Sequence, residues 1–319
     1  MPETLSIVVS IFGLIGLGYA AARSGLLAAS VGDGLSSFVF TLAIPLLLFE
    51  TLVTADFHDI SPWRVWAAYF VPFAIVWTMS HLMARRIFGR DERAGIVAGV
   101  SAAYSNSVLL GVPLIQAAYG ESGIVFAIAI IAVHTPLMML ASILLNERAL
   151  AASGDAARAA SRADAFRRLA HMLATNPIVV GIVAGLLWRL AGLQIPAVVA
   201  AVIDPLARSA GPLALFASGM ALVKFGMARQ IAPATAIATL KLLALPALVF
   251  AAASAIGLSP LGIAVVTLIA ACPTGVNAFL IASRLGTGEA LASNALLIST
   301  AAGVVTVSLW LVAVKAMLG

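Results

Sequence analysis

Long apolar stretches, separated by short clusters of charged residues, fill this chain almost from end to end. Hydrophobic residues make up 62% of its 319 residues and charged residues only 10%, whereas soluble domains average about 45–50% and 25%. A water-soluble core of this size cannot bury so much apolar side chain. A single cysteine, Cys272, excludes an internal disulfide framework. The chain is therefore expected to be an all-α polytopic membrane protein.

The apolar runs predict ten transmembrane helices, because one crossing takes about 20 residues. The expected spans are residues 4–22, 31–54, 63–84, 94–118, 122–145, 170–193, 196–223, 232–256, 259–284 and 288–317. No cleavable signal peptide is expected, since no lysine or arginine precedes the first span.

Basic residues concentrate in one set of loops. Thirteen of the 18 lysines and arginines lie in loops on one side, three lie on the other, and Arg208 and Lys241 fall within spans. Cytoplasmic loops carry the excess of lysine and arginine, so both termini are expected on the non-cytoplasmic side of a bacterial inner membrane. The net charge of +5 is then a topology signal, and the expected environment is the lipid bilayer, with no nucleic-acid partner.

The two halves of the chain resemble each other. Three pairs of segments match at offsets of 171, 171 and 167: residues 7–11 with 178–182, 106–111 with 277–282, and 45–49 with 212–216. With five spans in each half, the second repeat enters the membrane from the opposite face, which is typical of secondary transporters. The expected units are a first repeat over residues 1–146, a cytoplasmic linker over 147–169 and an inverted second repeat over 170–319.

Small polar residues, proline and glycine interrupt the fourth and ninth spans. Residues 101–113 read SAAYSNSVLLGVP and residues 270–277 read AACPTGVN. Proline lacks a donor and glycine permits unusual φ/ψ, so Gly111, Pro113, Pro273 and Gly275 predict a broken helix in each span. Unpaired backbone at membrane depth must be buried in protein or line a cavity, and paired breaks in matching repeat positions therefore indicate a binding site.

Asn106 and Asn277 occupy related positions at the two predicted breaks. Side-chain amides and the free N–H groups at half-helix N-termini suit a carboxylate. Ser105, Ser107 and Thr274 offer hydroxyl donors, and Tyr104 lies beside them. These six residues are the predicted substrate-binding set. The alternative is that the polar side chains only hold helices together.

At these motifs the chain resembles the auxin efflux carrier family, which includes bacterial permeases and the plant PIN proteins. The resemblance rests on residues 105–114 (SNSVLLGVPL), residues 273–282 (PTGVNAFLIA), Asn176-Pro177 and residues 212–219 (PLALFASG). It implies a fold like that of bile-acid sodium symporters and sodium/proton antiporters, with spans four and nine crossing at their breaks. It also implies a scaffold of spans 1, 2, 6 and 7 and a transport domain of spans 3–5 and 8–10.

Family members carry organic anions such as auxin, malate or malonate, and the resemblance implies that Asn106 and Asn277 contact the substrate carboxylate. Pro113 and Pro273 would then shape the crossing. The chain departs from the family at residues 105–107, which read Ser-Asn-Ser where many members have Asn-Thr-Gly.

Three further polar residues within spans are candidates for coupling or charge. His134 either carries a coupling proton or is structural, because histidine titrates near neutrality. Lys241 either counters an anion or, as we favour from the sequence, extends to the cytoplasmic interface. Glu50 and Asp204 are expected to pair with a basic residue such as Arg208 or Arg64.

The sequence predicts a secondary transporter of a small mono- or dicarboxylate that works by alternating access, through elevator-like or rocking movement. Substrate, direction, coupling ion (proton or sodium) and oligomeric state, a homodimer included, stay open. The alternative is a channel or a non-transporting ligand sensor on the same fold. The chain contains no enzyme motif or metal-ligand cluster, so no catalytic residue, cofactor or metal is expected.

Overall fold

The structure is a computed structural model that describes residues 2–55, 60–152, 167, 170–171, 173–225 and 231–318. The regular elements of these residues are helices, joined by one isolated β-bridge. They are α1 (Pro2–Arg23), α2 (Ala29–Phe38), η1 (Val39–Ala43), α3 (Ile44–Thr54), α4 (Pro62–Arg86), α5 (Glu92–Ala103), η2 (Ser107–Gly111), α6 (Val112–Ala152), α8 (Pro177–Leu190), α9 (Ala197–Leu222), α10 (Ile231–Thr239), η4 (Leu240–Ala244), α11 (Leu245–Ile256), α12 (Pro260–Ala271), α13 (Asn277–Leu285) and α14 (Glu289–Leu318). Of the predicted linker, residues 153–166 and 168–169 lie outside the described residues.

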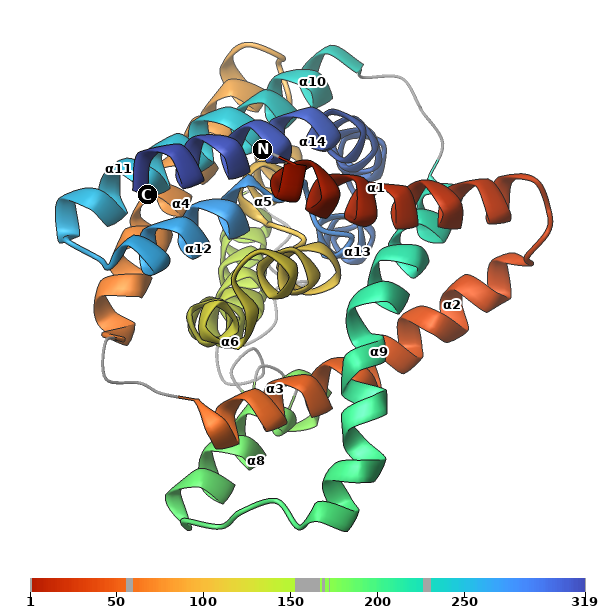
Figure 1. Cartoon of the computed structure of the whole chain (residues 1–319). Coiled ribbons are helices and arrows are strands. Elements are labelled where there is room, and N and C mark those ends of the chain that lie inside the picture. The colour runs from red at the N-terminus through yellow and green to blue at the C-terminus, as the bar shows by residue number, and fades with distance from the viewer. Residues whose placement is uncertain are drawn as a thin grey trace.

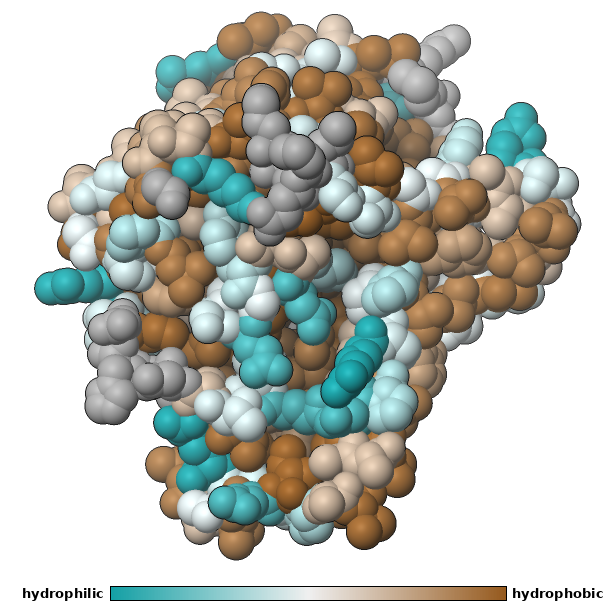
Figure 2. Space-filling view, in the orientation of Figure 1, coloured by the Kyte–Doolittle hydropathy of each residue, from teal (hydrophilic) through white to brown (hydrophobic). Residues whose placement is uncertain are grey.

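Apolar side chains cover much of the outer surface. Leu17 is 62% exposed, Leu187 61% and Leu309 62%, and Figure 2 shows a largely hydrophobic surface over α1 and α2. Seven helices among the described residues are long and apolar enough to cross a membrane, and α8 and α12 are shorter apolar helices. This surface and these lengths indicate a multi-pass membrane protein.

The helices divide differently from the ten predicted spans. The predicted fourth span, 94–118, is split between α5 and the continuous helix that begins with η2. That helix runs on as α6 through the predicted fifth span, 122–145, with Gly120 in a non-helical conformation (φ 62°, ψ −154°) between the two parts. The predicted ninth span, 259–284, is split into α12 and α13. The interruptions leave shorter helices, so length alone identifies fewer spans than the apolar pattern does.

In the described part of the chain, a proline follows each π-helical segment at the same distance. Pro45, Pro113 and Pro246 each lie two residues after the end of η1, η2 and η4. Proline has no N–H, and its ring meets the carbonyl four residues earlier. A wider π-turn accommodates both effects without ending the helix. Pro113 therefore lies inside a helix, which corrects the prediction that it breaks the fourth span.

Glycines bring two pairs of helices into close contact. A Cβ at Gly18 of α1 would overlap the carbonyl oxygen of Phe216 in α9, and a Cβ at Gly219 would overlap that of Ile15. Gly181 and Gly185 of α8 face α3 in the same way, where added Cβ atoms would lie 2.6 and 2.9 Å from the carbonyl oxygens of Pro45 and Phe49. Backbones approach this closely only where side chains are small.

The motif Gly-Ile-Val-Ala-Gly occurs twice, at residues 95–99 and 181–185, and its first copy packs α5 against α4. A Cβ at Gly95 would lie 2.9 Å from Nδ1 of His81, and one at Gly99 would lie 2.5 Å from Nε1 of Trp77. Both copies of the motif therefore serve close helix packing.

The helices form two groups (Figure 1). In the first, along the right and the bottom of the view, α1 and α2 contact α9 while α3 contacts both α8 and α9. In the second, α4 contacts α5 and α11, and α12 contacts α6, α11 and α14. The groups meet where η2 and α6 contact α9 and where α1 contacts α6 and α14.

Replacing Gly219 by valine is expected to separate α1 from α9, because its side chain has no space beside the Ile15 carbonyl. Overpacking of this kind costs about 1–3 kcal/mol, so the midpoint of thermal unfolding, followed by tryptophan fluorescence in detergent, should fall by several degrees. Gly13→Val is the matched control on α1, since a Cβ there meets nothing within 4 Å. Equal midpoints for the two variants would contradict the close approach.

Candidate functional site

Two helices stop inside the molecule and their ends pair with each other. Residues 104–106 follow α5 and residues 272–276 follow α12 in non-helical conformation, and we call these two segments the crossover. Ser105 and Thr274 form an antiparallel β-bridge. The N–H of Asn106 donates to the Pro273 carbonyl at 2.8 Å, and that of Gly275 donates to the Tyr104 carbonyl at 2.9 Å. Each break thus satisfies backbone groups of the other.

Local sequence explains why the chain leaves the helix here. Cys272 is extended (φ −56°, ψ 142°), which is the conformation favoured for a residue that precedes proline. Gly275 packs against the Tyr104 ring, where a Cβ would lie 2.7 Å from Cδ1. Gly111 lies in η2 rather than in the break, and an added Cβ would lie 2.7 Å from Cδ1 of Ile269. It therefore permits close packing of η2 on α12.

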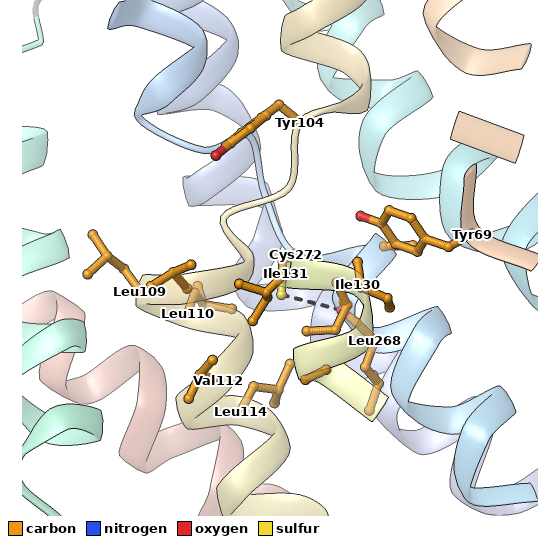
Figure 3. Close-up of a cluster of buried hydrophobic side chains, with 14 of the residues drawn as sticks. Tyr69, Tyr104, Leu109, Leu110, Val112, Leu114, Ile130, Ile131, Leu268 and Cys272 are labelled. Atoms are coloured by element: carbon orange, nitrogen blue, oxygen red, sulfur yellow. Dashed lines mark hydrogen bonds between the residues drawn. The ribbon is translucent and has the colours of Figure 1, made fainter. Parts of the chain in front are cut away.

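Apolar side chains pack against one side of the crossover, around Cys272 (Figure 3). Figure 3 shows Leu110, Leu114, Ile130 and Leu268 around the point where the extended segment after Tyr104 passes Cys272. Cys272 is fully buried and its thiol lies 3.3 Å from the Leu268 carbonyl. The side of the crossover around Cys272 thus lies in a low-dielectric environment, where hydrogen bonds are strengthened.

Tyr104 and Asn277 connect the two breaks through side chains. The Asn277 amide donates to the Tyr104 hydroxyl at 2.6 Å, and this hydroxyl lies 2.9 Å from Oγ1 of Thr135. Thr135, on α6, is a site residue that the sequence analysis did not select. Its position next to His134 and Pro136 in an apolar span is the sequence signal that could have identified it.

A cavity of about 630 Å³ opens beside the crossover. Its polar lining comes from Tyr104, Ser105, Asn106, Ser107, Thr135, Asn176 and Asn277, and its apolar lining includes Phe40, Met139, Val276, Leu280 and Ile281. Lys224, Arg284 and Asp33 lie on the same lining, and Lys224 forms an ion pair with Asp33. Five of the six predicted substrate-binding residues therefore share one cavity.

Thr274 is the sixth, and it does not line the cavity. Its hydroxyl donates to the Ser101 carbonyl at 2.8 Å, and its N–H donates to the Ser299 hydroxyl at 3.0 Å. Thr274 thus holds the carboxyl ends of α5 and α12 together and ties them to the interior of α14. Pro273 likewise contributes backbone rather than a cavity wall, through its carbonyl.

Lys241 does not extend to the membrane interface, contrary to our expectation from the sequence. Its side chain is fully buried, and Nζ donates to Oγ of Ser105 at 2.8 Å and to the Ala270 carbonyl at 2.6 Å. The prediction was wrong because the break after α12 leaves carbonyl groups inside the protein, and a buried ammonium can satisfy them. The sequence alone does not show that η4 packs beside this break.

His134 is fully buried and packs against aromatic rings. Its ring stacks on Tyr104, with centroids 4.7 Å apart, and meets Tyr69 and Phe73 edge-on. Neither ring nitrogen has a hydrogen-bond partner within the described part of the chain. His134 thus supports the Tyr104 ring from behind and stands outside the cavity lining.

Glu50 lies at a second cavity, of about 670 Å³, which shares no lining residue with the first. Glu121, Asp204 and Arg208 line the second cavity with it. Arg208 pairs with Asp204 at 3.3 Å, as the four-residue spacing predicts. Among the described residues, no three histidine, cysteine, aspartate or glutamate side chains gather in a group that could hold a metal ion.

Comparison with known proteins identifies the family of this chain. A family model described as "Membrane transport protein" matches residues 4–311. The chain belongs to this family, the auxin efflux carrier family. Membership of this family indicates a membrane transporter.

Three proteins illustrate the similarity of this chain to known sequences. A protein of Rhizobium meliloti (strain 1021) named "Putative malonate transporter" is 29% identical over 317 residues, covering 97% of this chain and 95% of the relative. The mouse "Lysosomal cholesterol signaling protein" is 28% identical over 253 residues, covering 74% of this chain but 28% of that protein. An "Uncharacterized transporter" of Methanothermobacter thermautotrophicus is 28% identical over 240 residues, covering 75% and 74%.

Replacing Thr274 by valine is expected to lower the free energy of unfolding by about 1–3 kcal/mol, because it leaves the buried Ser101 carbonyl without its donor. Thr239→Val is the matched control, since it removes an exposed hydrogen bond to the Thr235 carbonyl and should change stability by less than about 0.5 kcal/mol. Chemical denaturation in detergent measures both. A Thr274 variant as stable as the Thr239 variant would show that the hydrogen bond from Thr274 to Ser101 does not stabilise the fold.

Proposed function

We propose that this transporter carries a small organic anion and that the substrate carboxylate binds at the crossover. The observation that carries the proposal is the meeting of Asn106, Asn277 and the Tyr104 hydroxyl in one cavity. These groups offer donors without a fixed negative charge beside them, because Asp33, the acidic residue of the lining, is paired with Lys224. Amides and hydroxyls arranged in this way suit a carboxylate.

Backbone and charge add to the attraction for an anion. The helix formed by η2 and α6 begins at Ser107, beside Asn106, so its first N–H groups and positive dipole end face the cavity lining. Arg284 lies two turns along α13 from Asn277, and both line the cavity. A basic residue at this position raises the local concentration of anions.

Helix packing supports the inverted-repeat arrangement. Span one (α1) contacts span seven (α9), and span six (α8) contacts span two (α3), as a two-fold relation between the halves requires. The breaks after α5 and α12 occupy the same position in each half. We therefore infer ten spans, with the kinked η2–α6 helix supplying parts of spans four and five and with α12 and α13 forming span nine.

The two helix groups support a division of labour between a scaffold of spans 1, 2, 6 and 7 and a moving transport domain of spans 3–5 and 8–10. The cavity is lined by both groups, since Phe40 and Asn176 face Tyr104 and Asn277 across it. Movement of one group along the other would transfer the site between the two membrane faces. Lys224 and Arg284 lie on the side whose loops carry the excess of basic residues, and we take this side as cytoplasmic. The conformation is then inward-facing. Both termini would lie on the non-cytoplasmic side of a bacterial inner membrane.

The substrate class is a mono- or dicarboxylate. Malonate is one candidate, because it is the substrate in the name of the Rhizobium meliloti relative. The apolar walls of the cavity, among them Phe40, Met139 and Leu280, also suit an acid with a hydrophobic body, such as an auxin.

Asn106→Ala and Asn277→Ala are each expected to weaken carboxylate binding by about 10- to 150-fold, since a lost hydrogen bond to a charged group costs about 1.5–3 kcal/mol. Titration calorimetry of the purified chain with malonate and with indole-3-acetate measures the dissociation constants. Asn146→Ala is the control, because its amide accepts from Arg93 outside the cavity. Unchanged affinity in both site variants would refute the site.

A non-transporting sensor is the second candidate function, because one relative is named as a signalling protein. Substrate counterflow in proteoliposomes separates the two. A transporter exchanges external labelled carboxylate for internal unlabelled carboxylate, with saturation. A sensor binds the same anion without moving it, and a channel shows no counterflow.

A further inference from the structure

Lys241 is a fully buried basic side chain that contacts Ser105 at the crossover. It comes from η4, and its exposed fraction is 0%. Its ammonium bridges the two halves of the crossover, because Ser105 belongs to the first break and Ala270 to the end of α12 before the second. Ser105 itself lines the cavity, whereas Lys241 does not.

The Ala270 carbonyl depends on this contact. In a continuous helix it would accept from the N–H of residue 274, but Thr274 donates its N–H to Ser299 instead. The carboxyl ends of α5 and α12 both stop at the crossover, so their negative dipole ends converge on the ammonium. The end of α12 therefore has two effects: it leaves the Ala270 carbonyl without a backbone donor, and its negative dipole end stabilises a positive charge at the same point.

The described residues give Lys241 no carboxylate partner. The titratable groups that face it are the Tyr69 hydroxyl of α4, 3.1 Å from the shared Ser105 oxygen, the His134 ring of α6 and the Cys272 thiol. None of these is an aspartate or a glutamate. A fully buried ammonium without an ion-pair partner is costly, and helix dipoles balance only part of its charge. The missing negative charge is the one that an anion in the cavity would bring.

We propose that Lys241 is a positioning residue for anion transport, which acts through Ser105 as a built-in cation of the crossover. Its ammonium holds the carboxyl ends of α5 and α12 in place and sets a fixed positive charge directly under the polar lining of the cavity. The anion site is therefore complete without a bound metal cation. This inference rests on the proposed function, because it assigns a charge to the same site.

The test compares anion binding by the full-length chain, purified in detergent, in sodium chloride and in choline chloride. Malonate and indole-3-acetate are the probes, and titration calorimetry gives the dissociation constants. The wild-type chain is expected to bind at the same strength in both salts. Lys241→Met, which keeps an unbranched side chain one heavy atom shorter and removes the charge, should bind about tenfold more weakly or worse. Lys315→Met is the control, since Lys315 lies outside the cavity lining.

A second variant separates charge from packing. Lys241→Ala removes three methylene groups and the ammonium, so n-propylammonium matches the missing atoms. Added n-propylammonium chloride should recover at least about threefold of the lost affinity, and tetramethylammonium chloride, which cannot donate a hydrogen bond, should recover none. A role limited to filling space would not distinguish these two cations.

The outcomes also separate this inference from the proposed function. If the wild-type chain binds neither probe and no other carboxylate, the proposed function and this inference both fail. If it binds a probe only in sodium, if Lys241→Met binds like the wild-type chain, or if both ammonium salts act alike on Lys241→Ala, the role of Lys241 is overturned while the anion site stands.

Discussion

Backbone groups that are interrupted inside a membrane protein must find partners in the protein itself, since lipid offers none. In this chain two helices stop within the core, and their loose ends satisfy each other through the bridge between Ser105 and Thr274. Side chains supply the remaining donors: the Thr274 hydroxyl, the Ser299 hydroxyl and the Lys241 ammonium. The rest of the architecture depends on this closed set of hydrogen bonds.

The same interruption creates a place for a polar ligand. Helices that end at the crossover begin again on its other side, with Ser107 and Asn277 at the start of the new segments. Carboxyl ends on one side favour a cation and amino ends on the other favour an anion. Lys241 occupies the first environment, and the cavity lined by Asn106 and Asn277 offers the second. One backbone feature thus accounts for both the buried lysine and the proposed substrate site.

The breaks could be predicted from the sequence because proline and glycine disturb a helix through their own backbone chemistry. Pro273 and Gly275 act locally, so their effect on the backbone is readable from neighbours along the chain. The role of Pro113 was misjudged because a π-turn absorbs its missing N–H, and no residue pattern distinguished that outcome from a break. Lys241 and Thr274 were misplaced for a different reason. Their partners, Ala270 and Ser101, are 29 and 173 residues away, and such contacts follow from the packing of helices rather than from sequence spacing.

The central claim is that a carboxylate binds where the two helices are interrupted. The most direct measurement is a density map of the full-length chain in complex with 5-bromoindole-3-acetate, with anomalous or difference signal used to locate the bromine. We expect the carboxylate of the ligand to lie within hydrogen-bond distance of Asn106 and Asn277. Its ring should lie among Phe40, Met139 and Leu280. Density instead in the second cavity, beside Glu50 and Arg208, with the crossover cavity empty, would contradict it.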